Sequence, residues 1–192
     1  MAVASTMLAL GTPAPSFDLP DTISGADASI TDFADKKALL VMFICNHCPY
    51  VQHVRHGLVE LGRDYEDSEL GIVAISANDP AAYPTDSPDD MAREAKEFDY
   101  RFPYLYDESQ EVATAYTAMC TPDFFLFGPD RTLVYRGRFD DARPNTIARV
   151  TGADLRAAIE AVLSDHPVTV EQLPSLGCSI KWKPGNEPDY FS

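Results

Sequence analysis

The hydrophobic positions of the chain alternate between strand-like and helix-like patterns. Residues 38–44 and 71–77 are unbroken apolar runs of strand length, which is typical of strands covered on both faces. Between these runs, apolar side chains recur at helical spacing over residues 51–65, and Pro49 is favourable in the first turn of a helix. The pattern therefore predicts a strand-to-helix junction at residues 45–48.

The rest of the chain predicts three more helices and one β-hairpin. Three patterns are typical of the start of a helix: a serine before a proline, a serine before an apolar repeat, and a threonine three residues before an aspartate. Two apolar runs around a Gly-Pro-Asp turn are typical of a hairpin. The helix starts lie at Ser87-Pro88, at Ser109 with a helix through Met119, and at Thr151 with Asp154, and the hairpin joins residues 124–127 to 132–137.

This order of elements, β-α-β-α-(α)-β-β-α, predicts one α/β domain. The chain of 192 residues has about the length of one domain and can bury a substantial core. A proline-rich segment over residues 11–20 is expected to be extended. We expect residues 1–166 to form the domain with its N-terminal extension, and residues 167–192 to form a proline-interrupted C-terminal tail that packs on it.

Composition and charge exclude several classes of protein. The hydrophobic content of 45% and the charged content of 23% are ordinary for a soluble globular protein. No apolar run approaches the ~20 residues that a membrane-spanning helix needs. The net charge of −15 repels phosphate backbones, so no nucleic-acid partner is expected. Residues 1–10 have no features of a secretory signal, and the expected location is therefore cytoplasmic.

Cys45 and Cys48 form a C-x-x-C motif at the predicted junction. Four cysteines are too few for a disulfide-stabilised scaffold of this size. A thiolate attacks a disulfide, and the amides at a helix N-terminus lower the pKa of a thiol. We expect this effect at Cys45, with Cys48 one turn further on to attack the mixed disulfide, and a hydrogen bond from His47 to stabilise the Cys45 thiolate. The motif therefore predicts thiol–disulfide exchange.

Metal binding is an alternative use of the same cysteines. Zinc needs four ligands, and His53 and His56 complete a formal Cys2His2 set with Cys45 and Cys48. However, the helix carries both histidines away from its N-terminus, and the gap between the two pairs is short for a zinc finger. The competing interpretation makes both histidines surface residues. Zinc or copper binding through the two cysteines stays open, whereas thiol–disulfide exchange needs no metal and no cofactor.

Five segments of the chain resemble known redox proteins. The chain resembles the thioredoxin-like superfamily and, within it, the redoxin or AhpC/TSA-related branch that is called peroxiredoxin-like. The resemblance covers most of the chain and implies a central mixed β-sheet flanked by helices. The segments that carry it are Gly11–Leu19, Cys45–Val51, Ser76–Asp79, Cys120–Phe125 and Gly177–Lys183.

The resemblance also implies roles for individual residues. Cys45 is then the nucleophile and Cys48 the resolving cysteine of a thiol–disulfide oxidoreductase of the antioxidant type. Thr121-Pro122 matches a loop whose cis-proline faces the disulfide and whose backbone holds a substrate strand. A histidine between the cysteines is also found in the oxidising periplasmic members. Expected partners are protein or small-molecule thiols and disulfides. The supporting residues of the site are Asn46, His47, Pro49, Thr121 and Pro122.

One departure separates the chain from true peroxiredoxins. Their peroxidatic cysteine ends the motif Pro-x-x-x-Thr-x-x-Cys, whose three fixed positions correspond to Val41, Cys45 and Cys48. The hydroxyl that orients a peroxide is missing, so a thiol-dependent peroxidase of the same fold is kept as an alternative. Arg136 and Arg138 are candidates for a guanidinium near the site, or are ordinary charges at a strand end.

The two other cysteines are candidates for additional redox roles. Cys120 lies two residues before Pro122 and is expected near the active-site face, either as a small buried residue or as a redox thiol. Cys178 lies in the tail beside the basic segment 181–183 and is either a resolving or regulatory thiol or has no redox role. Trp182 is expected to anchor the tail on the domain.

Overall fold

The structure is a computed structural model that describes residues 2–144 and 146–191. Strands and helices alternate along these ranges in the order that the sequence predicted, which confirms the α/β class. The elements are β1 (Ala2–Ala4), β2 (Asp18–Pro20), β3 (Asp27–Ser29), the short 3-10 helix η1 (Ile30–Phe33), β4 (Ala38–Phe43), α1 (Pro49–Asp64), β5 (Leu70–Ser76), the 3-10 helix η2 (Pro84–Asp86), α2 (Pro88–Phe98), β6 (Tyr104–Tyr106), α3 (Glu111–Ala115), β7 (Cys120–Thr121), β8 (Asp123–Phe127), β9 (Leu133–Gly137), α4 (Ala153–Leu163) and β10 (Leu176–Ser179).

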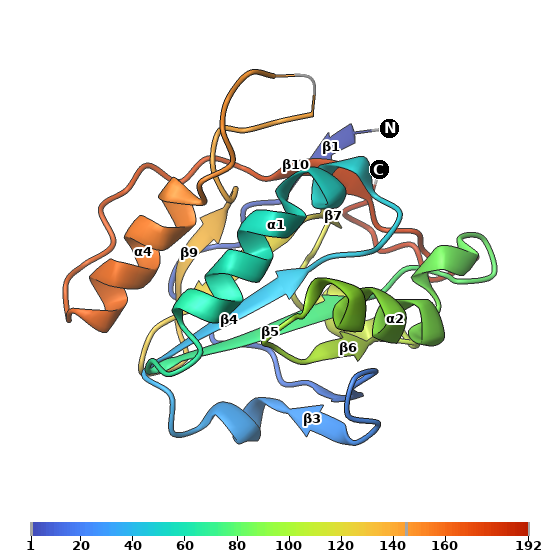
Figure 1. Cartoon of the computed structure of the whole chain (residues 1–192), viewed down its shortest axis with the longest axis horizontal. Coiled ribbons are helices and arrows are strands. Elements are labelled where there is room, and N and C mark those ends of the chain that lie inside the picture. Colours follow the sequence, from blue (N-terminus) through green and yellow to red (C-terminus); the bar gives the residue numbers. More distant parts are fainter. Residues whose placement is uncertain (1, 145, 192) are drawn as a thin grey trace.

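Five strands form a central mixed sheet in the order β6-β5-β4-β8-β9. β4 lies in the middle of this sheet, parallel to β5 and antiparallel to β8, so that Val41 is opposite Val73 on one side and Phe125 on the other (Figure 1). β4 and β5 are buried along their whole length, as the two apolar runs predicted. The central position of β4 carries the chain directly from the core into Cys45.

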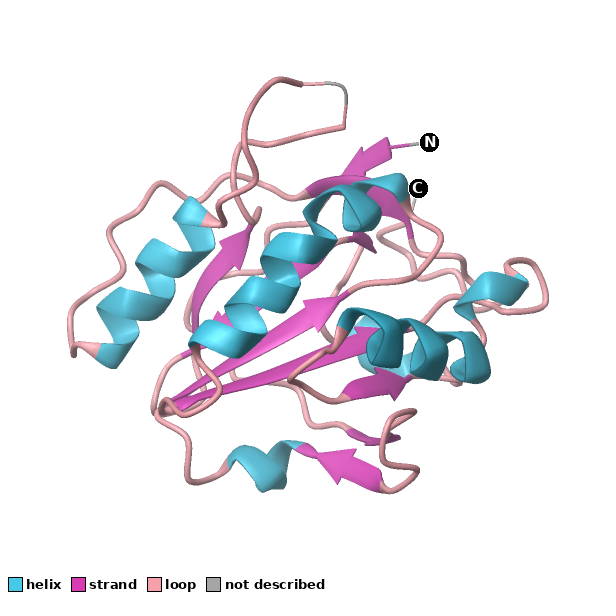
Figure 2. Cartoon of the chain, in the orientation of Figure 1, coloured by secondary structure: helices cyan, strands magenta, loops and turns pink. Residues whose placement is uncertain are grey.

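Two hydrophobic cores lie on opposite faces of the sheet, because successive side chains of a strand point to opposite sides. Leu40 and Met42 of β4 belong to the core that α1, α2 and α4 cover, and these three helices lie in front of the sheet in Figure 2. Leu39 and Val41 belong to the other core, together with side chains of α3 and of the C-terminal segment. Both faces are therefore covered, which explains why β4 is apolar at every position.

The two ends of the described chain meet in a second, three-stranded sheet. β10 lies between β1 and β7 and is antiparallel to both (Figure 1). Beyond β10, Trp182 is only 8% exposed and belongs to the core that also contains Leu39 and Val41, so it anchors this segment on the sheet. The division of the chain at residue 166 stays a prediction.

The sequence missed several short elements and placed one helix boundary wrongly. It did not predict β6 or the β2–β3 pair, because strands of three residues show too little alternation to be recognised. α3 contains only residues 111–115, whereas a helix from Ser109 through Met119 was predicted. Thr117 adopts a left-handed φ of 49°, which ends the helix before the chain turns into β7.

The predicted capping box at the start of α4 is also wrong. The cap position is Gly152, with a φ of 67°, and the side chain of Asp154 forms an ion pair with Arg138 instead. Asp140 supplies the missing acceptor, because its Oδ2 accepts hydrogen bonds from the amides of Thr151 (2.6 Å) and Gly152 (2.7 Å). Asp140 therefore holds the two residues that precede α4, while the first helical amide, that of Ala153, donates to Thr151 Oγ1 at 3.3 Å.

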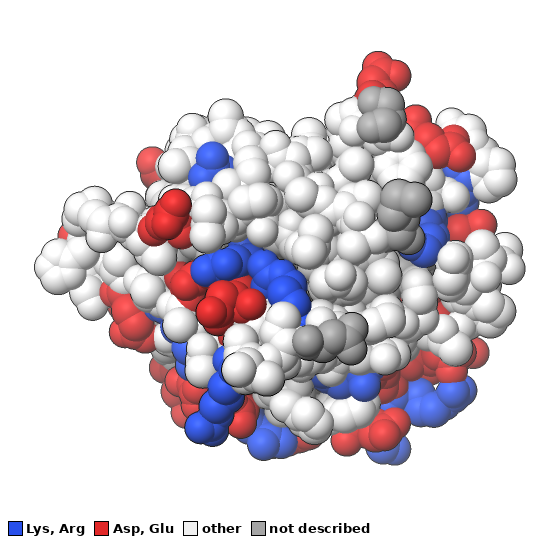
Figure 3. All heavy atoms as spheres, turned by 90° about the horizontal axis from the view of Figure 1, so that it is seen from above, with Lys and Arg blue, Asp and Glu red and all other residues white. Residues whose placement is uncertain are grey.

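Charge is unevenly distributed over the surface. Figure 3 shows the side of the molecule that lies uppermost in Figure 1, where β1 and β10 run. Uncharged atoms make up much of this face, and basic and acidic side chains gather beside one another. Within the described residues, no helix combines the length and the apolar character that crossing a membrane requires.

Asp123, the first residue of β8, is a buried acidic group. Its side chain is enclosed, and within the described part of the chain neither carboxylate oxygen has a hydrogen-bond partner of normal geometry. Burial raises the pKa of Asp123 to about 8, and the nearby amides of Met119 and Phe124 offset only part of this effect. The folded protein therefore favours the neutral carboxyl group.

Asp123 is expected to make the stability of the protein fall between about pH 4 and pH 8, because the unfolded pKa of an aspartate is about 3.9. The stabilisation by the neutral Asp123 carboxyl group is complete below the pKa that this group has in the unfolded chain. It is lost as the pH rises through the pKa of the same group in the folded protein. Asp123→Asn keeps the shape of the side chain and should flatten this dependence. Urea unfolding across this pH range measures it, with Asp141→Asn, an exposed position, as the control. Parallel curves for Asp123→Asn and the parent protein would contradict the assignment.

Candidate active site

Cys45 and Cys48 lie where β4 gives way to α1. β4 ends at Phe43, Pro49 is the first residue of α1, and Cys48 occupies the cap position directly before it. Proline fits this position because an amide in the first turn has no partner within the helix. Both cysteine side chains are 0% exposed, and both are free thiols.

The Cys48 sulfur is the more acidic of the two. Its largest stabilising interaction is a hydrogen bond from the Cys45 thiol; burial opposes ionisation, and the backbone amide of Val51 and the thiol of Cys178 add further hydrogen bonds. Together these contacts lower the pKa of Cys48 to about 4. The amides at the N-terminus of α1 thus act on the residue that immediately precedes the helix.

The surroundings of Cys45 raise its pKa, and its role as the nucleophile stays a prediction. Burial is the main cause that raises the pKa of Cys45, and the hydrogen bond to Cys48 and the nearby carboxylate of Asp86 raise it further. The Thr121 hydroxyl, 3.2 Å from Cys45 Sγ, opposes these effects without overcoming them.

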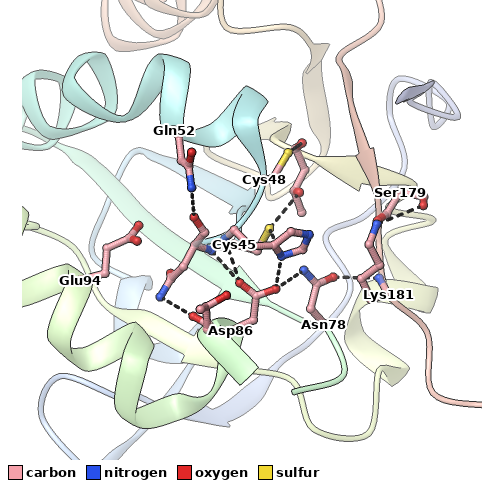
Figure 4. Close-up of polar contacts among 12 residues, drawn as sticks. Cys45, Cys48, Gln52, Asn78, Asp86, Glu94, Ser179 and Lys181 are labelled. Atoms are coloured by element: carbon pink, nitrogen blue, oxygen red, sulfur yellow. Dashed lines mark hydrogen bonds and ion pairs between the residues drawn. The ribbon is translucent and has the colours of Figure 1, made fainter. Parts of the chain in front are cut away.

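Asp86, which the sequence analysis did not single out, organises the loop between the cysteines (Figure 4). It is the last residue of η2 and is fully buried. Its carboxylate accepts hydrogen bonds from the backbone amides of Asn46 (2.9 Å) and His47 (3.1 Å), from Asn78 Nδ2 (2.8 Å) and from the His47 ring. Burial opposes ionisation of Asp86, but the hydrogen bonds from His47 and Asn78 outweigh it and lower the pKa of this carboxyl group.

His47 lies between Asp86 and Cys45. Its Nδ1 pairs with Asp86 Oδ2 and is 3.8 Å from Cys45 Sγ, and its ring stacks on Tyr83 at a centroid distance of 4.3 Å. The imidazole therefore partly shields Cys45 from the buried negative charge. His47 also borders an open cavity of about 440 Å³, whose lining includes Asn46, Gln52, Arg55 and Glu94.

Asn46 fixes the conformation of this loop. The Tyr104 hydroxyl donates to Asn46 Oδ1 and Asn46 Nδ2 donates to the Thr85 carbonyl, both at 3.0 Å. The carbonyl of Asn46 accepts a hydrogen bond of 2.9 Å from Gln52 in the first turns of α1. These contacts join β6, η2 and α1 around one residue and hold the two cysteines in place.

Thr121 and Pro122 lie directly beside the two sulfurs. The peptide bond between them is cis, as the resemblance implied. The hydroxyl of Thr121 contacts Cys45, and its carbonyl oxygen accepts a hydrogen bond of 3.1 Å from the Cys48 thiol. The loop that was expected to present a substrate strand therefore contacts both members of the cysteine pair.

Cys120 and Cys178 differ from each other in burial and in their contact with the candidate site. Cys120 is fully buried on β7, its Sγ is 3.6 Å from the Pro122 carbonyl, and burial raises its pKa well above the ordinary value. Cys178 is half-buried on β10, opposite Thr121, and packs against the core cluster that contains Cys48. Cys178 is therefore a third thiol in contact with the candidate site.

The other candidates from the sequence lie in different surroundings. Arg136 bonds to the Leu8 carbonyl and to Gln172, and Arg138 pairs with Asp154, so both guanidinium groups have other partners. His56 is exposed on α1 against Phe98. His53 and His56 do not join a metal-ligand cluster with the two cysteines anywhere in the residues that the structure describes.

A different set of potential metal ligands does lie close together. The ligand atoms of Cys45, His47 and Asp86 are all within 4.8 Å of one another. However, the Asp86 carboxylate already accepts four hydrogen bonds, two of them from backbone amides. Hydrogen bonding alone accounts for this arrangement, so the geometry favours the redox interpretation over metal binding.

Comparisons with known proteins place the chain in a family. The model of the AhpC/TSA family matches residues 10–136. A crystal structure of an uncharacterized conserved protein from Geobacillus kaustophilus is similar, with 52% identity, a TM-score of 0.94, and coverage of 96% of this chain and 98% of that one. A hypothetical protein from Sinorhizobium meliloti gives 49% identity, a TM-score of 0.93, and coverage of 95% and 99%. No curated protein matches.

A more distant structure supports the fold alone. The thioredoxin domain of a thiol-disulfide oxidoreductase from Bacteroides vulgatus has 19% identity and a TM-score of 0.60, and the match covers 78% of this chain and 96% of that one. The mixed sheet and its helices are thus those of a thioredoxin-like fold. Family and fold together support thiol-based redox activity in general. The chain belongs to the AhpC/TSA family.

Proposed function

We propose that the protein is a thiol–disulfide oxidoreductase whose redox couple is Cys45 and Cys48. The single observation that supports this most is that Thr121 contacts both sulfurs at the N-terminus of α1, with its hydroxyl 3.2 Å from Cys45 Sγ and its carbonyl oxygen 3.1 Å from Cys48 Sγ. These contacts hold the two sulfurs side by side, and the surroundings of Cys48 lower its pKa, which are the two requirements of a dithiol that exchanges with disulfides.

Within this couple, Cys48 is the attacking thiolate and Cys45 is the second thiol. Cys48 attacks a substrate disulfide, so that one substrate thiolate leaves and a mixed disulfide forms. The Cys45 sulfur then attacks Cys48 Sγ, releases the second substrate thiolate and passes its proton to it. The sequence predicted the opposite roles, and the acidity of Cys48 favours this order.

Reversible oxidation of the pair is the direct test of the function. Equilibration with reduced and oxidised glutathione should convert Cys45 and Cys48 into one intramolecular disulfide, detected by alkylation of the remaining thiols and peptide mass mapping. Cys45→Ser and Cys48→Ser should each abolish this disulfide. If the wild-type protein never links Cys45 to Cys48, the proposed function is wrong.

The assignment of the thiolate has a spectroscopic test. Thiolate absorbance of the reduced protein should titrate with an apparent pKa of about 4, far below the value of about 8.5 for a free cysteine. Cys48→Ser should remove this low transition. Cys45→Ser should keep it, because a hydroxyl replaces the donating thiol, whereas Cys45→Ala should shift it upward. Loss of the transition in Cys45→Ser with retention in Cys48→Ser would restore the roles predicted from the sequence.

His47 is expected to make the couple more oxidising, because its hydrogen bond to Asp86 offsets part of the negative charge that disfavours a thiolate within the cysteine pair. In His47→Phe the stacking on Tyr83 can persist but the hydrogen bond to Asp86 is lost. The reduced form should become less stable, and the reduction potential should fall by about 30 mV or more, which corresponds to about 1.4 kcal/mol. His56→Phe, an exposed position on α1, is the matched control. Equal potentials in the two variants would rule out this positioning role.

A thiol-dependent peroxidase is the second candidate function. The observation in its favour is the low pKa of Cys48, which occupies the position of the peroxidatic cysteine, with Cys45 donating the hydrogen bond in place of a threonine. Hydrogen peroxide consumption with a thiol donor should then be lost in Cys48→Ser and kept in Cys45→Ser. Wild-type protein that consumes no peroxide would exclude this activity.

A further inference from the structure

β10 occupies the edge of the active site at which an extended substrate would pair. Cys178 is the antiparallel partner of Thr121, and β1 covers the other edge of β10. Figure 4 shows the chain that carries Ser179 and Lys181 running past the two cysteines. The backbone of Thr121 therefore already holds a strand, and this strand belongs to the protein itself.

The contact between β10 and the Thr121 loop is close and specific. A Cβ atom at Gly177 would lie 2.0 Å from the Thr121 carbonyl oxygen, so a larger residue cannot take this place without moving the strand. Beyond β10, Ile180 N donates to the Met119 carbonyl at 3.1 Å and Lys181 N donates to Asn78 Oδ1 at 2.8 Å. The strand is thus held from both sides of Cys178.

Cys178 contacts Cys48 and also reaches the surface. Cys178 packs against the core cluster that contains Cys48, and it is the strand partner of Thr121, whose carbonyl oxygen contacts Cys48 Sγ. Cys45 and Cys48 are completely buried, whereas Cys178 is half-buried. Burial and the hydrogen bond to Cys48 raise the pKa of Cys178 to about 11, and Lys181 opposes this rise. Of the three thiols, Cys178 is the one that a solvent molecule can approach.

We propose that Cys178 is a third redox residue of this centre, the exchange thiol through which small-molecule thiols and disulfides react with the buried couple of Cys45 and Cys48. This inference rests on the proposed function of that couple. It also names the substrate class: small thiols and disulfides can reach a half-buried sulfur, whereas an extended polypeptide would have to displace β10 from Thr121.

The oxidised protein is reduced in three successive thiol–disulfide exchanges. Cys178 attacks Cys48 Sγ of the Cys45–Cys48 disulfide; the Cys48–Cys178 bond forms, and Cys45 leaves and takes the proton of Cys178. A small thiol then attacks Cys178 Sγ, so that Cys48 leaves as a thiolate. A second small thiol attacks the mixed disulfide and frees Cys178. In sum, two small thiols are oxidised to one disulfide, and Cys45 and Cys48 are reduced.

The acidity of Cys48 favours the second exchange. A thiolate of low pKa is a good leaving group, so attack on the Cys48–Cys178 disulfide is directed to the Cys178 sulfur. That sulfur is also the more accessible of the two. Oxidation by a small disulfide runs through the same steps in reverse.

Trapping the internal disulfide tests the proposal. In Cys45→Ser, oxidised glutathione should yield a Cys48–Cys178 disulfide as the main product, identified by acid quenching, alkylation and peptide mass mapping. Gly177→Ala in the same background should reduce its yield, because the added Cβ pushes β10 away from Thr121. If Cys48 and Cys178 carry only glutathione or remain free, the proposal is wrong.

Kinetics of the full-length protein provide the second measurement. Reduction of the Cys45–Cys48 disulfide by glutathione should be about tenfold slower or more in Cys178→Ser, because the buried sulfurs then react only after local opening. Cys120→Ser, the same change at a buried cysteine opposite Ser179, should react at the wild-type rate. An unchanged rate in Cys178→Ser, with the Cys45–Cys48 disulfide still forming, overturns the role of Cys178 alone. Absence of that disulfide from the wild-type protein overturns the proposed function as well.

Discussion

The contact of Thr121 with both cysteine sulfurs is the interaction on which the rest of the site depends. The surroundings of the two sulfurs differ: the Cys45 side chain and the amide of Val51 favour a thiolate at Cys48, whereas burial is the main cause that raises the pKa of Cys45, and the Asp86 carboxylate adds to it. The asymmetry gives each sulfur a distinct chemical role before any substrate is present.

The surrounding residues hold this asymmetry in place. Asp86 fixes the loop through two backbone amides, and Asn46 ties the same loop to β6, η2 and α1. Thr121 contacts both sulfurs from the opposite side. β10 then covers the pair and adds Cys178 to it. The site is accordingly a closed arrangement of three thiols, in which chemistry at the buried pair depends on how the covering strand is held.

The fold was readable from the sequence where its patterns are long. Continuous apolar runs identified β4 and β5, and the proline at position 49 marked the start of α1 correctly. Short elements escaped, because three-residue strands carry little periodicity. The capping box of α4 was misassigned because Asp154 pairs with Arg138 and because Asp140 accepts the amides of Thr151 and Gly152, which precede the helix. Local signals therefore identified elements reliably, whereas their exact ends depended on contacts from elsewhere in the chain.

The candidate site shows the same division. The sequence by itself determined that two cysteines lie at a strand-to-helix junction, since the patterns on both sides are local. The acidity of each cysteine was decided by tertiary structure, because it depends on burial and on Asp86, which lies 40 residues from Asn46 along the chain. The placement of Cys178 against Cys48 likewise follows from the pairing of β10 with β7. No local pattern encodes such pairings, because they are fixed only when distant segments pack together.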